Sequence, residues 1–240
     1  MTPPKRTWTP LPNLEDEEVE ASLDVRGDNK TVSIYILEKL CVLVDSCLPG
    51  ESIDLATDSY TGLASDIHAW GHTTGHSVRQ LDGQSGYDRY IIKKNDQVDE
   101  QANITKKKVA IIISQDGLLD LISPLGFALG AATAGMDVAL YFQGSGVRVL
   151  KKGFKGRYKT GLSALLFSGL ARNGMAAIGH APPAEKLEQL KRLGAKIYVC
   201  HPSLDHFGVK VESIAFPGVI LAEYVTFLEE MSDATVKLYT

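Results

Sequence analysis

A cysteine that ends an apolar strand is the residue of this sequence best placed to do chemistry. The run Ile-Tyr-Val-Cys closes at Cys200, and Pro202, two residues later, is typical of the first turn of a helix. A thiol at that point faces backbone N–H groups and the positive end of a helix dipole, with His201 beside it, and both effects favour the thiolate. A buried strand-end cysteine that acts as a small hydrophobe gives the same pattern. Both interpretations stay open from position alone.

Polar and glycine-rich turns follow the other strands predicted near Cys200. In open parallel sheets, ligands bind outside the carboxyl ends of the strands, so the turns that follow successive strands meet at one edge. We therefore expect these residues to be loop neighbours of the cysteine: Asp116, Gly144, Ser145, Gly146, His180, Ser203 and His206. The glycine turn could hold a phosphate group, but it lacks a complete G-x-G-x-x-G or P-loop pattern, so we expect no cofactor.

The other cysteines and the spaced histidines do not indicate a metal site. Cys41 falls on the apolar face of a predicted helix and Cys47 lies near its end, and a separation of six residues does not suit a zinc pair. His68, His72 and His76 are four residues apart, but glycines weaken that helix and no acid completes an H-E-x-x-H pattern. Structural roles are favoured for all five.

A basic run stands out between Arg148 and Lys159. It holds six basic residues and no acid, with Phe154 and Tyr158 interleaved. Three interpretations are open: a nucleic-acid patch, a solvated mobile loop, or a surface that steers an anionic substrate or an acidic partner towards Cys200.

The composition excludes several classes of protein. The chain has 240 residues, 44% of them hydrophobic and 22% charged, which suits a globular protein with room for two domains. A net charge of -4 argues against a nucleic-acid partner. Three cysteines do not make a disulfide scaffold and fit a reducing compartment such as the cytoplasm. The start of the chain lacks the apolar segment of a signal peptide, and no run of about 18 apolar residues predicts a membrane span.

Local composition divides the chain into four parts. Residues 1–20 combine prolines with acids and read as a flexible acidic tail, and residues 95–107 have the polar composition of a linker. Residues 21–94 and 108–240 each carry their own periodic pattern. The pattern of the first predicts a β-α-β-α-β-β order, a two-layer sandwich with two helices on one side of a four-stranded sheet.

The second patterned segment alternates strand and helix. Its predicted strands are 109–113, 137–142, 196–200 and 235–239, and its predicted helices are 121–134, 182–193 and 221–231. The apolar first strand fits burial on both faces. The alternation predicts an α/β domain with a mostly parallel sheet between helical layers, a three-layer, flavodoxin-like arrangement.

Residues 21–94 resemble the TusA/SirA sulfur-carrier domain. The matching points are Leu23-Asp24-Val25-Arg26-Gly27, Leu48-Pro49-Gly50-Glu51, Asp58, Gly75-His76 and Tyr90-Ile91-Ile92-Lys93. The functional signature of that family is a Cys-Pro pair at the start of the first helix, where this chain has Lys30-Thr31. The resemblance therefore implies a carrier fold without its sulfur-carrying residue, which we interpret as a docking module.

Residues 107–240 resemble the DsrE/DsrF-like family, in the branch often labelled peroxiredoxin-family. The resemblance rests on Lys107–Ser114, Gly135-Met136-Asp137-Val138, Pro182-Pro183, Leu193-Gly194-Ala195 and Val199-Cys200, with Asp205 and Gly208-Val209 extending it. Members of that family carry a reactive cysteine at the end of this strand, which corresponds to Cys200. Relatives form homo-oligomers, so the resemblance implies self-association through this domain.

Together these patterns predict a sulfur-relay protein, of sulfur-carrier or sulfurtransferase type. Cys200 would hold a persulfide, His201 would assist it, and donor or acceptor proteins would be the partners, with no membrane and no nucleic acid involved. The rival hypothesis is a non-catalytic small-ligand-binding or protein-interaction scaffold in which Cys200 is simply buried.

Overall fold

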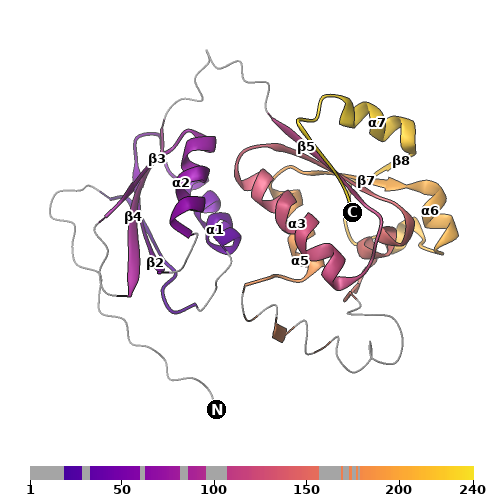
Figure 1. Ribbon diagram of the computed structural model, residues 1–240, viewed down its shortest axis with the longest axis horizontal. Coiled ribbons are helices and arrows are strands. Elements are labelled where there is room, and N and C mark those ends of the chain that lie inside the picture. The colour runs from indigo at the N-terminus through magenta and orange to yellow at the C-terminus, as the bar shows by residue number, and fades with distance from the viewer. Residues whose placement is uncertain are drawn as a thin grey trace. The chain divides into compact units, whose positions relative to one another are not determined.

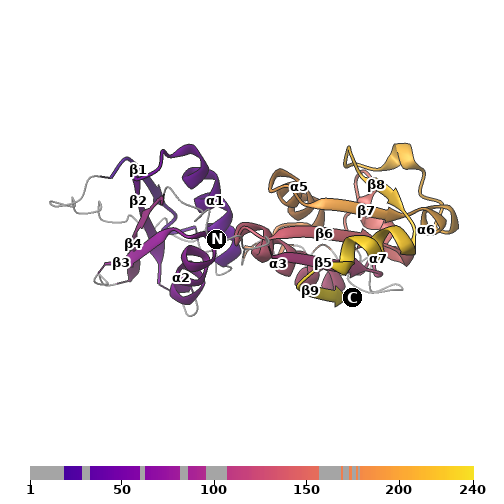
Figure 2. The same ribbon diagram turned by 90° about the horizontal axis from the view of Figure 1, so that it is seen from above.

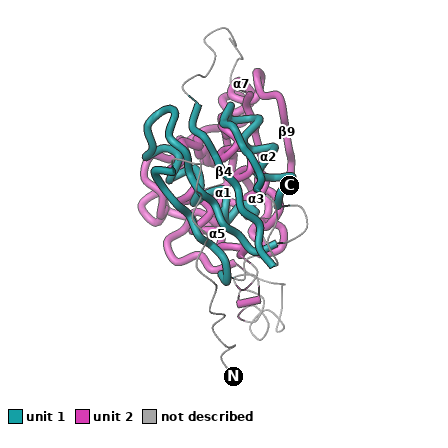
Figure 3. The backbone as a smooth tube through the Cα atoms, turned by 90° about the vertical axis from the view of Figure 1, so that its left-hand side faces the viewer, with its two compact units in different colours: residues 1–103 teal, residues 104–240 magenta. Residues whose placement is uncertain are grey.

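The structure is a computed structural model that describes six stretches of the chain. These are residues 19–28, 33–59, 63–81, 86–95, 107–156 and 179–240, together with the isolated positions 169, 173, 174 and 177. The chain divides into two compact units, residues 1–103 and residues 104–240 (Figure 3). Within the described stretches, no helix combines the length and the apolar character that crossing a bilayer requires.

Unit 1 has the predicted β-α-β-α-β-β order. Its elements are β1 (Ala21–Asp24), α1 (Ser33–Ser46), β2 (Ser52–Asp58), α2 (Leu63–Thr74), β3 (Ser77–Gln80) and β4 (Tyr87–Lys93). They form a mixed sheet of order β1-β2-β4-β3, in which only the β1–β2 pair is parallel. Both helices pack on one face of that sheet (Figure 1). The prediction of a two-layer sandwich is confirmed.

The core of unit 1 follows the helical and strand periodicities of its sequence. Leu40 of α1 and Ile67 of α2 are fully buried against Ile53 of β2. The buried charges of this core form an ion pair between neighbouring strands, in which Arg89 Nη2 donates to Asp54 Oδ2 at 2.7 Å. Because a charge buried without its partner is costly, this pair fixes the register of β2 against β4.

Unit 2 is a three-layer α/β domain. Its main elements are β5 (Lys108–Ile113), α3 (Leu118–Thr133), β6 (Asp137–Phe142), the 3-10 helix η1 (Gly144–Leu150), α5 (Pro183–Arg192), β7 (Lys196–Cys200), α6 (His201–His206), the 3-10 helix η2 (Val211–Ser213), β8 (Ile220–Ala222), α7 (Tyr224–Ser232) and β9 (Val236–Tyr239). The five strands are all parallel, in the order β8-β7-β6-β5-β9, which can be followed in Figure 2. The prediction of a mostly parallel sheet between helices is confirmed.

Side chains alternate between the two faces of this sheet and divide its core. Figure 1 shows α7 on one side of the strands and α3 with α5 on the other. Ala110, Tyr141 and Cys200 project to the α7 side, where Phe227 packs on them. Because all strands are parallel, their carboxyl ends, which finish at residues such as Ile113 and Cys200, share one edge of the sheet.

Three details of unit 2 differ from the sequence prediction. The expected helix 221–231 is instead a short strand, β8, followed by α7, because Leu221 pairs in parallel with Val199 of β7. The turn expected at Gly144–Gly146 begins the 3-10 helix η1, whose Val147, Val149 and Leu150 are fully buried. Helix α3 starts three residues earlier than predicted, at Leu118.

Candidate functional site

Cys200 stands at the strand-to-helix transition that the sequence predicts. It is the last residue of β7 and the N-cap residue of α6, with extended backbone angles of φ -68° and ψ 109°. Its thiol is not in a disulfide, and its residue is only 2% exposed. The thiol is thus at the carboxyl edge of the sheet but covered in this conformation.

The cover over Cys200 is α7, which is attached mainly through one buried aromatic side chain. Phe227 is the one buried residue of that helix. Its ring stacks on Tyr141 at a centroid distance of 4.7 Å and meets Tyr198 edge-on at 5.4 Å. Val225 and Leu228 face outward, whereas Met231 is half-buried against the same cluster and Tyr224 meets the Tyr141 ring edge-on. A helix held by so few buried contacts is a candidate for local opening.

The far end of α7 is held by a charged cluster. Glu230 accepts hydrogen bonds from Tyr198 Oη and Lys196 Nζ, and Lys108 Nζ lies 2.7 Å from its Oε1. Burial acts to raise the pKa of Glu230, but the hydrogen bonds from Lys108, Tyr198 and Lys196 outweigh it and hold the pKa at about 2. The first half of α7, nearer Cys200, has no comparable anchor among the described residues.

Tyr141 is the polar neighbour of the Cys200 thiol. Its buried hydroxyl makes no hydrogen bond of ordinary geometry among the described residues. Burial and then the interaction with Cys200 raise the pKa of Tyr141, which keeps its hydroxyl protonated. A small rotation of either side chain would align the Tyr141 hydroxyl with the Cys200 thiol. Tyr141 can therefore donate a hydrogen bond to a negatively charged sulfur at position 200.

His201 points to solvent rather than to the thiol. Its side chain is 53% exposed, and its Nδ1 lies 3.8 Å from Asp205 Oδ2, one turn further along α6. The contact that His201 makes is with Asp205, so this conformation does not support the predicted role of His201 in assisting the thiol.

The glycine turn and Ser203 do come together at the carboxyl edge. Ser203 Oγ accepts a hydrogen bond from the Gly144 amide at 3.0 Å, and Ser145 Oγ donates to the carbonyl of Ser114. At Gly146, an added Cβ would come within 2.3 Å of the Ile113 carbonyl oxygen, so only glycine permits this approach. The turn is therefore packed on the strand ends next to α6.

The other predicted loop neighbours make their contacts with residues other than Cys200. Asp116 pairs with Arg148 at 3.4 Å. His206 is exposed and packs on Phe207. His180 lines a small cavity formed with residues of α3 and α5, on the face opposite to α7, and burial lowers its pKa. The structure does not bring His180 to Cys200.

Cys41 and Cys47 lie in unit 1 and have structural surroundings. Both belong to or pack against the core of that unit. Burial raises the pKa of Cys41 to about 11 and also raises the pKa of Cys47. Because the thiolate is the nucleophile, these two thiols are poor candidates for sulfur chemistry at neutral pH.

Sequence reasoning missed Tyr141 and Phe227. The signal for Tyr141 was present, since strand alternation puts it on the same face as Cys200, and it pairs with Tyr198 in the neighbouring strand. The position of Phe227 depends on how α7 folds back over the sheet, which no local pattern specifies.

Comparison with known proteins identifies unit 2. The DsrE/DsrF-like family matches residues 107–238. No curated protein matches the chain. Among solved structures, the chain is similar to the ychN protein from E. coli, with 15% identity and a TM-score of 0.38, covering 56% of this chain and 99% of that one. It is likewise similar to MTH1491 from Methanobacterium thermoautotrophicum, described as a protein of unknown function, with 16% identity, a TM-score of 0.36 and the same coverage.

Proposed function

The chain belongs to the DsrE/DsrF-like family through residues 107–238, and from this premise we propose that it is a sulfur-relay protein in which Cys200 carries sulfane sulfur as a persulfide. The observation that carries the proposal is the place of Cys200: it is the one cysteine of the family domain and ends β7 at the carboxyl edge of the sheet. The two cysteines of unit 1 have raised pKa values and structural surroundings.

The proposed relay consists of two displacements at sulfur. In the first, the Cys200 thiolate attacks the terminal sulfane sulfur of a polysulfide or persulfide, the donor's S–S bond breaks, and the shortened donor leaves with the electron pair. Cys200 then holds a persulfide anion. In the second, the thiolate of an acceptor attacks the outer sulfur and releases Cys200 as a thiolate, so no net oxidant is needed. Because the family domain has no second cysteine, the acceptor is another protein.

Tyr141 is the proposed positioning residue for the persulfide. Its pKa is raised by burial and by Cys200, so its hydroxyl remains a donor at neutral pH. A protonated hydroxyl beside the thiol offers a hydrogen bond to the anionic outer sulfur in an otherwise apolar cluster. Removing it as Tyr141→Phe would leave the sulfur charge without that donor.

Access to Cys200 requires α7 to move. With a residue exposure of 2%, the thiol cannot meet a donor in the described conformation. Helix α7 is fastened near Cys200 by Phe227 and by an edge contact of the exposed Tyr224 with Tyr141, whereas Glu230 holds its far end. The relay therefore proceeds through a minor state in which the first half of α7 lifts.

We further propose that unit 1 is a TusA/SirA-like docking module. Support comes from its β-α-β-α-β-β order and its sheet order β1-β2-β4-β3. The positions that would carry the Cys-Pro signature, Lys30 and Thr31, lie outside the described residues. The proposal predicts that unit 1 takes up no sulfur itself.

A second candidate function is a non-catalytic scaffold. The observation that favours it is the burial of Cys200 among Tyr141, Ala222 and Phe227, which is also what a core cysteine would show. The two functions differ in what happens to the thiol in a folded protein that meets sulfane sulfur.

Sulfur loading measured by mass spectrometry distinguishes the two functions. The folded full-length chain is incubated with polysulfide, and its intact mass is compared before and after a reductant, for wild type and for Cys200→Ser. The relay predicts a reducible addition of sulfur that is absent from Cys200→Ser. If the wild-type protein gains no sulfur, or if Cys200→Ser gains as much as wild type, the relay function is rejected and the scaffold function is retained.

A further inference from the structure

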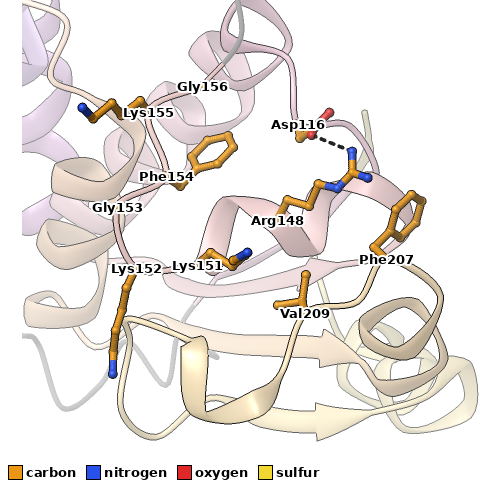
Figure 4. A pocket seen from close by; sticks show the side chains of 10 residues that line it. All are labelled: Asp116, Arg148, Lys151, Lys152, Gly153, Phe154, Lys155, Gly156, Phe207 and Val209. Atoms are coloured by element: carbon orange, nitrogen blue, oxygen red, sulfur yellow. Dashed lines mark hydrogen bonds and ion pairs between the residues drawn. The ribbon is translucent and has the colours of Figure 1, made fainter.

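A second cavity lies at the carboxyl edge of the unit 2 sheet, apart from the Cys200 cluster. Its volume is about 470 Å³, within the range of small-molecule sites. Its lining comes from three places: Asp116 after β5, the segment from Arg148 to Gly156, and Phe207 with Val209 after α6 (Figure 4). None of these residues belongs to the cluster around Cys200.

The lining of this cavity is strongly cationic. Arg148, Lys151, Lys152 and Lys155 line it, against the single carboxylate of Asp116. The chain as a whole carries a net charge of -4, so the excess of positive charge in this cavity does not follow from the overall composition. A concave surface of one sign concentrates ions of the opposite sign. The cavity is therefore suited to an anion.

Arg148 and Lys151 lie three residues apart at the end of η1, on one wall of the cavity, and Figure 4 shows the Arg148 guanidinium turned towards Asp116. Asp116 Oδ2 lies 3.4 Å from Arg148 Nη1 and forms an ion pair with it. Lys152 Nζ donates a hydrogen bond to the Glu212 carbonyl oxygen at 3.3 Å. No carboxylate of the described residues pairs with Lys151. Two neighbouring cations on one wall repel each other, and an anion that contacts both relieves that repulsion.

The apolar part of the lining indicates that the ligand is more than an inorganic ion. Phe154 and Phe207 are half-buried, and Val209 is buried. The Arg148 guanidinium lies 4.8 Å from the Phe207 ring centroid, a cation–π contact that holds both groups in place. Aromatic side chains beside cationic ones provide stacking for planar rings and charge for phosphates.

The wall of the cavity is held by contacts on two sides. Lys151 forms an antiparallel bridge with Ile214, and the Lys152 amide donates to the Ser213 carbonyl at 2.9 Å. At Gly156, where φ is 73°, a Cβ would come within 2.8 Å of the Leu118 side chain. A wall held in this way loses little conformational freedom when a ligand binds.

We propose that this cavity binds a small organic phosphate that carries a planar ring, of the nucleoside phosphate class. The phosphate contacts Arg148 and Lys151, and the ring packs against Phe154. Asp116 opposes the phosphate and sets the affinity below its maximum. This site is independent of the sulfur chemistry proposed for Cys200.

Isothermal titration calorimetry on the full-length chain tests the site with three probes: ADP, inorganic phosphate and adenosine. ADP should bind more tightly than either fragment. Arg148→Gln and Lys151→Gln should each weaken ADP binding by about tenfold or more, since a charge-assisted hydrogen bond is lost. Asp116→Asn should tighten it, because the competing carboxylate is gone. Phe154→Leu should weaken ADP binding without changing the affinity for inorganic phosphate.

Matched controls make the proposal falsifiable. Lys237→Gln removes an exposed cation of β9, and Cys200→Ser removes the thiol; both should leave ADP binding unchanged. The site is overturned if ADP gives no binding at millimolar concentration, if adenosine binds as tightly as ADP, or if the Arg148 and Lys151 variants bind like wild type. Equal affinity for phosphate and ADP also overturns it, since the ring then contributes nothing. Thermal denaturation of each variant confirms that it is folded.

Discussion

Replacing Phe227 by alanine should uncover Cys200 while the protein stays folded. Phe227 is the one buried residue of α7, and its ring packs on Tyr141 and Tyr198 over the cysteine. The truncation removes the main apolar attachment of the helix to the sheet. Because the thiol can react only when α7 lifts, its alkylation rate follows the population of the lifted state.

The magnitude follows from the contacts that are lost. Burial of a phenylalanine side chain contributes about 1.5–3 kcal/mol, and each aromatic pair adds about 0.5–1.5 kcal/mol. The alanine side chain still buries a small apolar area, and neighbouring side chains relax into the space that the ring leaves. The free energy of local opening of α7 should therefore fall by about 2–3 kcal/mol. At about 1.36 kcal/mol per tenfold, this corresponds to a rise of roughly 30- to 150-fold in the alkylation rate.

The assay is alkylation of the folded chain at neutral pH, followed by mass spectrometry of the peptide that contains Cys200. Leu228→Ala, on the neighbouring exposed position of the same helix, is the matched control and should change the rate by less than about threefold. Equal rates for wild type, Phe227→Ala and Leu228→Ala would refute the reasoning. An increase in the alkylation rate of Cys47 as large as that of Cys200 would also refute the reasoning, because unit 1 contains no part of α7.

Two further predictions concern charged groups. Asp54→Ala leaves the buried Arg89 guanidinium without its carboxylate partner and should lower the free energy of unfolding of unit 1 by about 3–5 kcal/mol. Denaturation followed by tryptophan fluorescence measures this change, because both tryptophans of the chain belong to unit 1. Glu230 has a folded pKa of about 2, below its ordinary value of 4.5, so its stabilising contribution is complete above about pH 4.5 and is lost as the pH falls towards 2. Glu230→Gln should therefore lower the melting temperature of unit 2 at pH 7 and flatten its dependence on pH between 4.5 and 2.

Exposed neighbours provide the controls for these two variants. Asp45→Ala, on the outer face of α1, should change the stability of unit 1 by no more than about 0.5 kcal/mol. Glu229→Gln should leave the pH dependence of unit 2 as in wild type. If either control behaves like its test variant, the ion pair in question does not carry the stability assigned to it.

Local periodicity was sufficient to predict most of the elements and the place of Cys200. The apolar run that ends at Cys200 and the proline at Pro202 are local signals for a strand followed by a helix, and both elements are present. The β-α-β-α-β-β order of unit 1 was likewise readable, since its strands and helices are bounded by turn residues such as Pro49 and Gly50.

Long-range packing decided what the sequence alone did not predict. Leu221 and Ala222 have no strong local preference and become strand β8 because β7 offers a free edge. Phe227 and Cys200 are distant along the chain but lie in one buried cluster, so no local sequence pattern predicts that Phe227 covers the cysteine. The cavity between Arg148 and Phe207 brings together a basic run and the end of α6, and only the run itself was visible in the sequence.

The most direct test of the central claim is the identity of the cysteine that carries sulfur. The folded full-length chain is loaded with polysulfide, its persulfides are trapped by alkylation, and each cysteine peptide is analysed by mass spectrometry. The account predicts a persulfide on the peptide that contains Cys200, with Cys41 and Cys47 unmodified. Sulfur on Cys41 or Cys47 with none on Cys200 would contradict it.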